Sequence, residues 1–205
     1  MQFTESPHLR QLERLMQGIP NFLPRGYGTM LLYGTVRRNE CGESDNAAPR
    51  VELIKRTMSA IRYSPFTRRL QKYLDERKEP PMEYRNEKHK AAFTNAIEKL
   101  DRKNYALTAA LYLLTADHRL WMSVKRKISG NTICFEQINL PNCSVGAYTL
   151  FCAAKDLYLG TKHLTVSDLA DRELIPPKMF ALICNAMTIR RYGIGAINFK
   201  ERNEL

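Results

Sequence analysis

Apolar residues fill almost every position between Asn104 and His118, in the sequence NYALTAALYLLTADH. Leu107, Ala110, Leu111 and Leu114 follow the i, i+3, i+4, i+7 spacing of one helix face, and most residues between them are apolar too. A helix that is apolar on every side is a buried helix. The stretch is shorter than the roughly 20 apolar residues that a membrane-spanning helix needs. It therefore predicts the central helix of a folded core, with Asn104 as its N-cap.

Residues that start and stop helices mark further helices on both sides of this stretch. Asn86, Asp117, Ser144 and Thr165 each precede a segment with helical periodicity, as N-caps do. Asp168 follows Thr165 at the spacing of a capping box. The predicted helices cover residues 6–18, 50–63, 64–78, 86–100, 104–118, 118–128, 145–160, 165–171 and 177–193.

One segment alternates in the manner of a strand, from Thr132 to Leu140. A single strand leaves its backbone groups unpaired, so it needs a partner in Met30–Tyr33, in the tail near Ile197 or in another chain. The alternative is that the segment is merely extended. Together these patterns predict a mainly α fold, a helical bundle with at most one small β-hairpin or sheet.

A break in the pattern divides the chain into two predicted regions. Pro80-Pro81 cannot continue a helix, so we place the boundary there. Residues 1–80 are predicted to form an N-terminal basic helical region with a mobile loop near 37–50, where apolar periodicity is absent. Residues 86–205 are predicted to form a C-terminal helical bundle domain.

The charge is strongly positive and unevenly distributed. The 32 Lys and Arg residues exceed the 21 Asp and Glu residues, giving a formal net charge of +11. Residues 50–78 alone carry nine basic and three acidic side chains. Such a balance favours polyanionic partners, although a solvated helix face gives the same pattern. The predicted binding residues, which lie mainly off the apolar stripes, are Lys55, Arg56, Arg62, Arg68, Arg69, Lys72, Lys125, Arg126 and Lys127.

Cysteine usage and motifs argue against a metal site or a familiar enzyme. The five cysteines include no C-x-x-C, and Cys134, Cys143 and Cys152 are nine residues apart rather than in tight zinc-binding pairs. G-x-S-x-G, P-loop, H-E-x-x-H and G-x-G-x-x-G motifs do not occur. The start of the chain lacks the apolar core of a signal peptide. We expect a cytoplasmic, non-enzymatic protein with free thiols, no metal, no cofactor and no membrane partner. An enzyme with an unrecognised site is the less favoured alternative.

The segment 164–191 suggests a different way of binding DNA. Its helix, turn and helix are arranged as in a helix-turn-helix motif, which would make the protein a DNA-binding transcriptional regulator. Base reading requires polar side chains on the second helix, and only Lys178, Asn185 and Thr188 are available. Leu174 stands where such turns usually have glycine. This reading is therefore the alternative and not the main hypothesis.

About half of the chain, residues 87–193, resembles an uncharacterised domain family. The resemblance is carried by EKHKAAFTNAIEKL, D-x-x-N-Y-A-L-x-A-A-L-Y-L-L-T, Trp121, AAKDLYLG and FALICNAMTIRRYG. The family occurs in small proteins encoded by plasmids, conjugative elements and phages of Gram-positive bacteria, and it has no established catalytic residues. It implies an α-rich accessory protein of a mobile element. With the charge, it leads us to expect binding to DNA, RNA or a protein–nucleic acid complex such as a CRISPR nuclease, in its sharpest form as an anti-CRISPR inhibitor.

Overall fold

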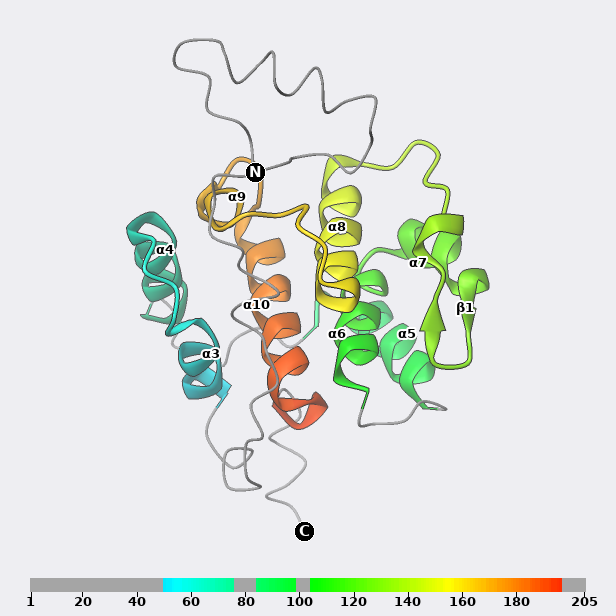
Figure 1. Cartoon of the computed structure of the whole chain (residues 1–205), viewed down its shortest axis with the longest axis horizontal. Helices are drawn as coiled ribbons and strands as arrows, with labels where there is room; N and C mark the ends of the chain where they lie inside the picture. The colour runs from blue at the N-terminus through cyan, green and yellow to red at the C-terminus, as the bar shows by residue number, and fades with distance from the viewer. Residues whose placement is uncertain (1–49, 76–83, 99–103, 197–205) are drawn as a thin grey trace.

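Two helices, α6 (Tyr105–Leu114) and α10 (Pro177–Tyr192), lie side by side at the centre of the computed structural model (Figure 1). The structure describes residues 50–75, 84–98 and 104–196. Every residue from Leu107 to Ala116 is buried, as the all-apolar sequence of α6 predicts. Every residue from Phe180 to Ile189 in α10 is buried as well. The core is therefore organised around a pair of helices and not around α6 alone.

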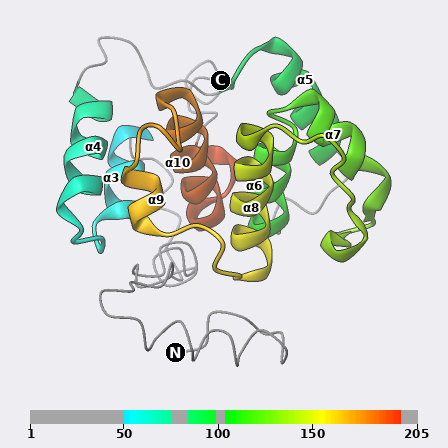
Figure 2. The ribbon, with the colours of Figure 1, turned by 90° about the horizontal axis from the view of Figure 1, so that it is seen from above.

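The remaining helices cover this pair from two sides (Figures 1 and 2). On the side of α10 lie α3 (Arg50–Met58) and α4 (Ser64–Asp75), and α9 (Val166–Ala170) packs on α4. On the side of α6 lie α5 (Glu87–Ile97), α7 (His118–Val124) and α8 (Val145–Leu159). The short elements are η2 (Lys125–Lys127), β1 (Ile128–Ser129), β2 (Thr132–Ile133), η3 (Phe135–Gln137) and η4 (Ile194–Ala196). The mainly α prediction is confirmed.

Local capping signals were reliable guides to where helices begin. The side chains of Asn86, Asn104, Asp117 and Ser144 each accept a hydrogen bond from the backbone N–H three residues later. Thr165 and Asp168 form the predicted capping box of α9. Each cap satisfies a donor that the first turn of a helix would otherwise leave unpaired. None of the helices in the described ranges is long and apolar enough to cross a membrane.

The predicted strand at Thr132–Leu140 is wrong over most of its length. Only Thr132 and Ile133 are in a strand, and Ile133 pairs antiparallel with Ile128. A turn through Gly130, at φ +53°, brings this local partner back, so no distant strand is needed. The chain then enters η3 because Phe135 turns into the core, with its ring centroid 5.4 Å from that of Phe151. Met30–Tyr33 and Ile197, the partners considered from sequence, lie outside the described residues.

Helices α3 and α4 share the hydrophobic core of the rest of the bundle. The ring centroids of Phe66 and Tyr73, both on α4, lie 5.8 Å and 5.7 Å from that of Phe180 on α10. The described part of the predicted N-terminal region is therefore packed into the bundle. The helix predicted at 6–18, the loop near 37–49 and the boundary at 80–81 lie outside the described residues, so the division into regions 1–80 and 86–205 stays a prediction.

Candidate functional site

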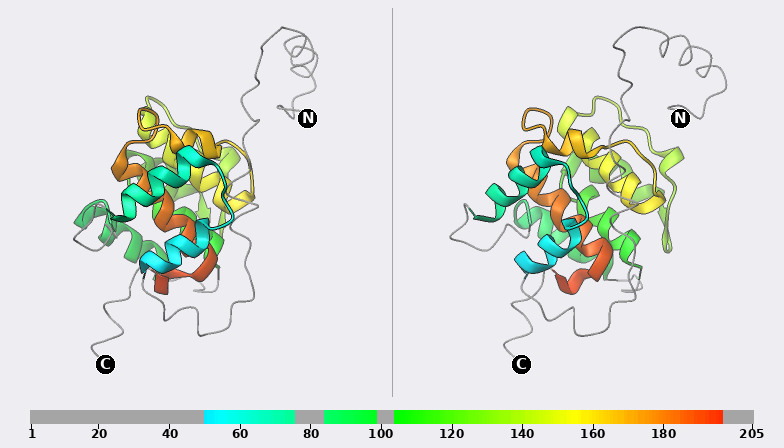
Figure 3. Two further views of the ribbon diagram at one scale, coloured as in Figure 1. Left: turned by 90° about the vertical axis from the view of Figure 1, so that its left-hand side faces the viewer. Right: turned by 60° about the vertical axis from the view of Figure 1, so that its left-hand side comes forward.

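The clearest candidate is a set of exposed cations on α3, on α4 and in the turn between them. We call this set the α3–α4 basic face and define it as Lys55, Arg56, Arg62, Arg68 and Lys72, all of which are exposed. Figure 3 shows α3 and α4 in front of α10, with their outer sides turned to the viewer. The inward positions of these helices are taken mainly by apolar side chains such as Leu53 and Phe66, which leaves these five cations outside.

Three of these cations have no polar partner among the described residues. Lys55, Arg62 and Arg68 make no hydrogen bond or ion pair with any residue in the described part of the chain. Arg56 differs, because its Nε lies 3.0 Å from Oε1 of Glu52 one turn earlier on α3. Both side chains of that pair are nearly half exposed, so solvent screens it and it contributes at most about 1 kcal/mol. A phosphate can therefore compete with Glu52 for the Arg56 guanidinium at small cost.

The structure corrects the prediction for Arg69, which is not on the surface. Arg69 is buried, and its guanidinium donates to the backbone carbonyl oxygens of Leu169 at 2.8 Å, Asp171 at 2.7 Å and Ile175. It also lies 4.3 Å from the ring centroid of Phe180. All of these contacts hold α4 to the end of α9 and to α10, so the buried Arg69 guanidinium is not available to an external partner.

The remaining predicted cations, Lys125, Arg126 and Lys127, form a second and separate group. They make up η2, directly after α7. Figures 1 and 2 both show α3 and α4 at one end of the molecule and α7 with β1 at the other. The structure therefore does not bring η2 and the α3–α4 basic face together, and the set predicted from sequence is split into two patches.

Sequence reasoning missed one neighbour of the basic face. Arg191, in the last turn of α10, donates from Nη1 to the backbone carbonyl oxygen of Arg56 at 3.2 Å. This contact places the end of α10 against the end of α3. Nothing in the sequence pairs two residues that are 135 positions apart.

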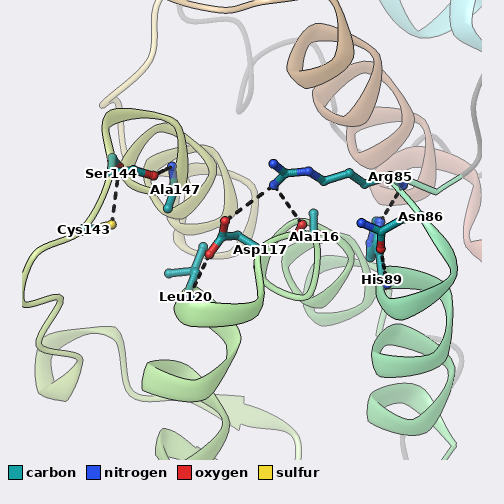
Figure 4. Close-up of polar contacts among 9 residues, drawn as sticks. All are labelled: Arg85, Asn86, His89, Ala116, Asp117, Leu120, Cys143, Ser144 and Ala147. Carbon is teal, nitrogen blue, oxygen red and sulfur yellow. Dashed lines mark hydrogen bonds and ion pairs between the residues drawn. The ribbon is translucent and has the colours of Figure 1, made fainter.

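A second candidate is a pocket of about 240 Å³ between the start of α7 and the segment before α8 (Figure 4). Two of its polar members, Asp117 and Ser144, are helix caps. Asp117 accepts a hydrogen bond from the N–H of Leu120 at 3.0 Å, and Arg85 Nη1 lies 3.5 Å from its carboxylate. Ser144 accepts one from the N–H of Ala147 at 3.2 Å. The lining residues are Asp117, Arg119, Leu120, Ser123, Leu140, Pro141, Asn142, Cys143, Ser144 and Ala147.

The thiol in this pocket is not activated. Partial burial, and then the nearby Asp117 carboxylate, raise the pKa of Cys143 above its ordinary value. The thiolate is the nucleophilic form, so a raised pKa keeps the group unreactive at neutral pH. The Cys143 Sγ is 3.5 Å from its hydrogen-bond acceptor, the carbonyl oxygen of Ser144. The pocket can accept a small polar group, but its contacts do not supply a nucleophile and base pair.

An aspartate and a histidine meet at the end of α8. The buried Asp156 lies 2.7 Å from Nδ1 of His163 and also accepts hydrogen bonds from Thr161 Oγ1 and from the N–H groups of His163 and Leu164. A carboxylate can orient a catalytic imidazole in this way, but catalysis also needs a nucleophile beside the other ring nitrogen. Within the described ranges, no Ser, Thr or Cys side chain is hydrogen-bonded to that nitrogen. The contacts of Asp156 instead fix the loop that follows Gly160.

The described residues contain no group of three or more His, Cys, Asp and Glu side chains that could hold a metal ion. Cys134, Cys143 and Cys152 are free thiols in the structure, as is Cys184. The fifth cysteine, Cys41, lies outside the described residues.

The helix-turn-helix hypothesis loses the side chains on which it depends. Asn185 and Thr188 are both fully buried. Asn185 Nδ2 donates to the hydroxyl of Tyr112 at 3.0 Å, and Thr188 donates to the carbonyl oxygen of Cys184 at 2.8 Å. Only Lys178 is exposed. A recognition helix must lie on the surface to enter a groove, whereas α10 is at the centre of the bundle.

Comparison with known proteins adds no information on the candidate sites, which rest on their geometry alone. The resemblance of residues 87–193 to a mobile-element domain family remains an expectation from the sequence. No protein-family model, no curated protein and no solved structure matches the chain.

Proposed function

We propose that this chain is a non-enzymatic basic accessory protein that binds DNA or RNA through the α3–α4 basic face. One observation carries the proposal. Lys55, Arg62 and Arg68 are exposed at one end of the molecule and have no partner among the described residues. Exposed cations at one end of a molecule attract polyanions, and a nucleic-acid backbone offers a row of phosphates to them.

The physical basis of this binding is counterion release. Each cation that neutralises a phosphate releases a condensed counterion, so the affinity falls as salt rises. The formal net charge of +11 adds a long-range attraction that speeds the encounter with any polyanion. A contact of this kind is made with the nucleic-acid backbone and carries no sequence information. We therefore propose binding with little sequence preference.

The biological setting follows from the mobile-element resemblance of residues 87–193. A small basic protein of a plasmid or phage can protect its element by occupying nucleic acid inside a host defence nuclease. We propose this as the finer form of the function, with a nuclease complex of the CRISPR type as the target. In that form the basic face blocks the groove that the nuclease uses for its guide or its target strand.

Charge reversal at the two basic patches tests the proposal. Arg62→Glu/Arg68→Glu and Lys125→Glu/Arg126→Glu each remove four units from the same net charge, but at opposite ends of the molecule. Nucleic-acid affinity is measured by fluorescence anisotropy at about 50 mM salt. The first variant should lose most of its affinity and the second should keep most of it. Equal losses would mean that net charge alone drives binding, and a selective loss in the second variant would move the site to η2.

A further inference from the structure

Tyr63 is an exposed aromatic side chain inside the α3–α4 basic face. It lies in the turn between α3 and α4, and 41% of its surface is exposed. The other large hydrophobic side chains that are exposed in the described ranges belong to other elements, namely Met122, Val145, Tyr148, Leu159 and Leu174. Among the exposed aromatic side chains of the described ranges, Tyr63 is therefore the one with exposed cations close to it on both sides in the sequence.

The backbone around Tyr63 is fixed although its ring is exposed. Its carbonyl oxygen accepts a hydrogen bond from the N–H of Thr67 at 3.0 Å, which ties the residue directly before α4 to the first turn of that helix. One residue before Arg62, Ile61 is buried, and its N–H donates to the carbonyl oxygen of Met58 at 3.0 Å. A ring presented by an anchored turn loses little conformational freedom when a ligand stacks on it.

Cations extend from the ring in both directions along the chain. Arg62 precedes Tyr63 directly, and Lys55 and Arg56 lie on the last turn of α3. On α4, Arg68 and Lys72 are four residues apart, so they lie on one face about 6 Å from each other along the helix axis. Along the chain, an exposed aromatic side chain therefore stands between two sets of exposed cations.

We propose that this surface binds single-stranded nucleic acid, with a base stacked on the ring of Tyr63 and with Arg62 and Arg68 on the flanking phosphates. The inference rests on the proposed function and names its substrate class. A duplex offers only its phosphates to such a surface, because its base faces are stacked inside the helix. A single strand offers phosphates and the face of an unstacked base together.

The stacking contribution predicts how strongly the ring matters. Replacing an aromatic residue that stacks on a base by alanine weakens single-strand binding by about five-fold to 150-fold. Duplex binding through phosphates alone does not use the ring. Tyr63→Ala should therefore reduce the affinity for a single strand and leave the affinity for a duplex unchanged, and Tyr63→Phe should retain both.

The experiment compares a labelled oligothymidylate with a duplex of the same length, using the full chain at about 50 mM salt. The variants are Tyr63→Ala and Tyr63→Phe, and Tyr148→Ala is the matched control because Tyr148 is also exposed but lies on α8. We expect the wild-type protein to bind the single strand more tightly than the duplex. Tyr63→Ala should lose this preference, whereas Tyr63→Phe and Tyr148→Ala should keep it. If wild-type protein binds both substrates and Tyr63→Ala changes neither, the inference is overturned while the proposed function stands. If wild-type protein binds neither substrate, both fail.

A second measurement does not depend on how a variant folds. A bromouracil-substituted single strand is irradiated in complex with the wild-type protein, and the cross-linked peptide is identified after tryptic digestion. Cleavage after Arg62 and Arg68 gives the peptide YSPFTR, which begins with Tyr63. A cross-link in this peptide is the expected result. Cross-links confined to peptides from other parts of the chain would overturn the inference.

Discussion

Arg69 Nη1 lies 2.8 Å from the carbonyl oxygen of Leu169, a residue one hundred positions further along the chain. The same guanidinium reaches the carbonyl oxygens of Asp171 and Ile175, beyond the end of α9. Backbone carbonyls at the end of a helix replace the water that a buried cation has lost. The contact explains how a charged residue can occupy an inward position of α4 and join α4, α9 and α10.

The first prediction concerns this buried cation. Arg69→Met keeps much of the side-chain volume but leaves the three carbonyl oxygens without a donor. We expect a loss of about 2–4 kcal/mol in the free energy of unfolding, measured by urea denaturation followed by circular dichroism. Arg68→Met, at the exposed neighbouring position, should change it by no more than about 0.5 kcal/mol. Equal stabilities for the two variants would contradict the role given to Arg69.

The second prediction concerns His89, which is buried in the core beside Tyr112. Its Nδ1 accepts the N–H of Arg85 at 3.0 Å, so its Nε2 carries the proton and donates to the carbonyl oxygen of Tyr112 at 2.8 Å. Burial is the main reason that the pKa of His89 falls from 6.5 to about 4. Between about pH 4 and pH 6.5, His89 is therefore mainly neutral in the folded state and mainly protonated in the unfolded state.

A depressed histidine pKa makes stability depend on pH in one direction. The contribution of His89 is complete above about pH 6.5 and decreases as the pH falls toward 4. We expect wild-type protein to lose roughly 3 kcal/mol more than His89→Gln over this interval, in urea denaturation at a series of pH values. Parallel pH profiles for the two proteins would show that His89 titrates normally in the folded state.

The third prediction concerns the all-apolar helix α6. Leu111 is buried at its centre, whereas Leu159 at the end of α8 is exposed. Leu111→Asp places an unpaired charge in the core and should cost several kcal/mol, about enough to unfold a domain of ordinary stability. Leu159→Asp should leave the circular dichroism spectrum and the melting temperature nearly unchanged. A folded Leu111→Asp protein would show that α6 is not central.

Much of the fold could be predicted because its signals are local. Capping residues such as Asn104 and Ser144 act on a backbone group three residues away, and the burial of α6 follows from its own composition. The burial of polar residues could not be predicted, because Asn185 depends on Tyr112, 73 residues distant. Arg69 is an intermediate case. It stands at i+3 from Phe66, within the inward stripe of α4, but its charge favoured an exposed position.

The candidate site was predicted in its components but not in its arrangement. The sequence identified the cations of α3, α4 and η2, since all of them except Arg69 lie off the apolar stripe of their own segment. It gave no information on how those segments are placed, and the structure puts η2 and the α3–α4 basic face at opposite ends. The proximity of Arg191 to Arg56 likewise depends on tertiary packing.

The salt dependence of nucleic-acid binding tests the central claim most directly. Wild-type protein should bind at about 50 mM salt, with an affinity that falls steeply as salt is raised. Arg62→Glu/Arg68→Glu should bind more weakly, and the slope of log affinity against log salt should be smaller by about 1.5 to 2, the equivalent of two lost phosphate contacts. Lys125→Glu/Arg126→Glu should keep the wild-type slope. An absence of binding at low salt, or equal slopes for all three proteins, would contradict the assignment of the α3–α4 basic face.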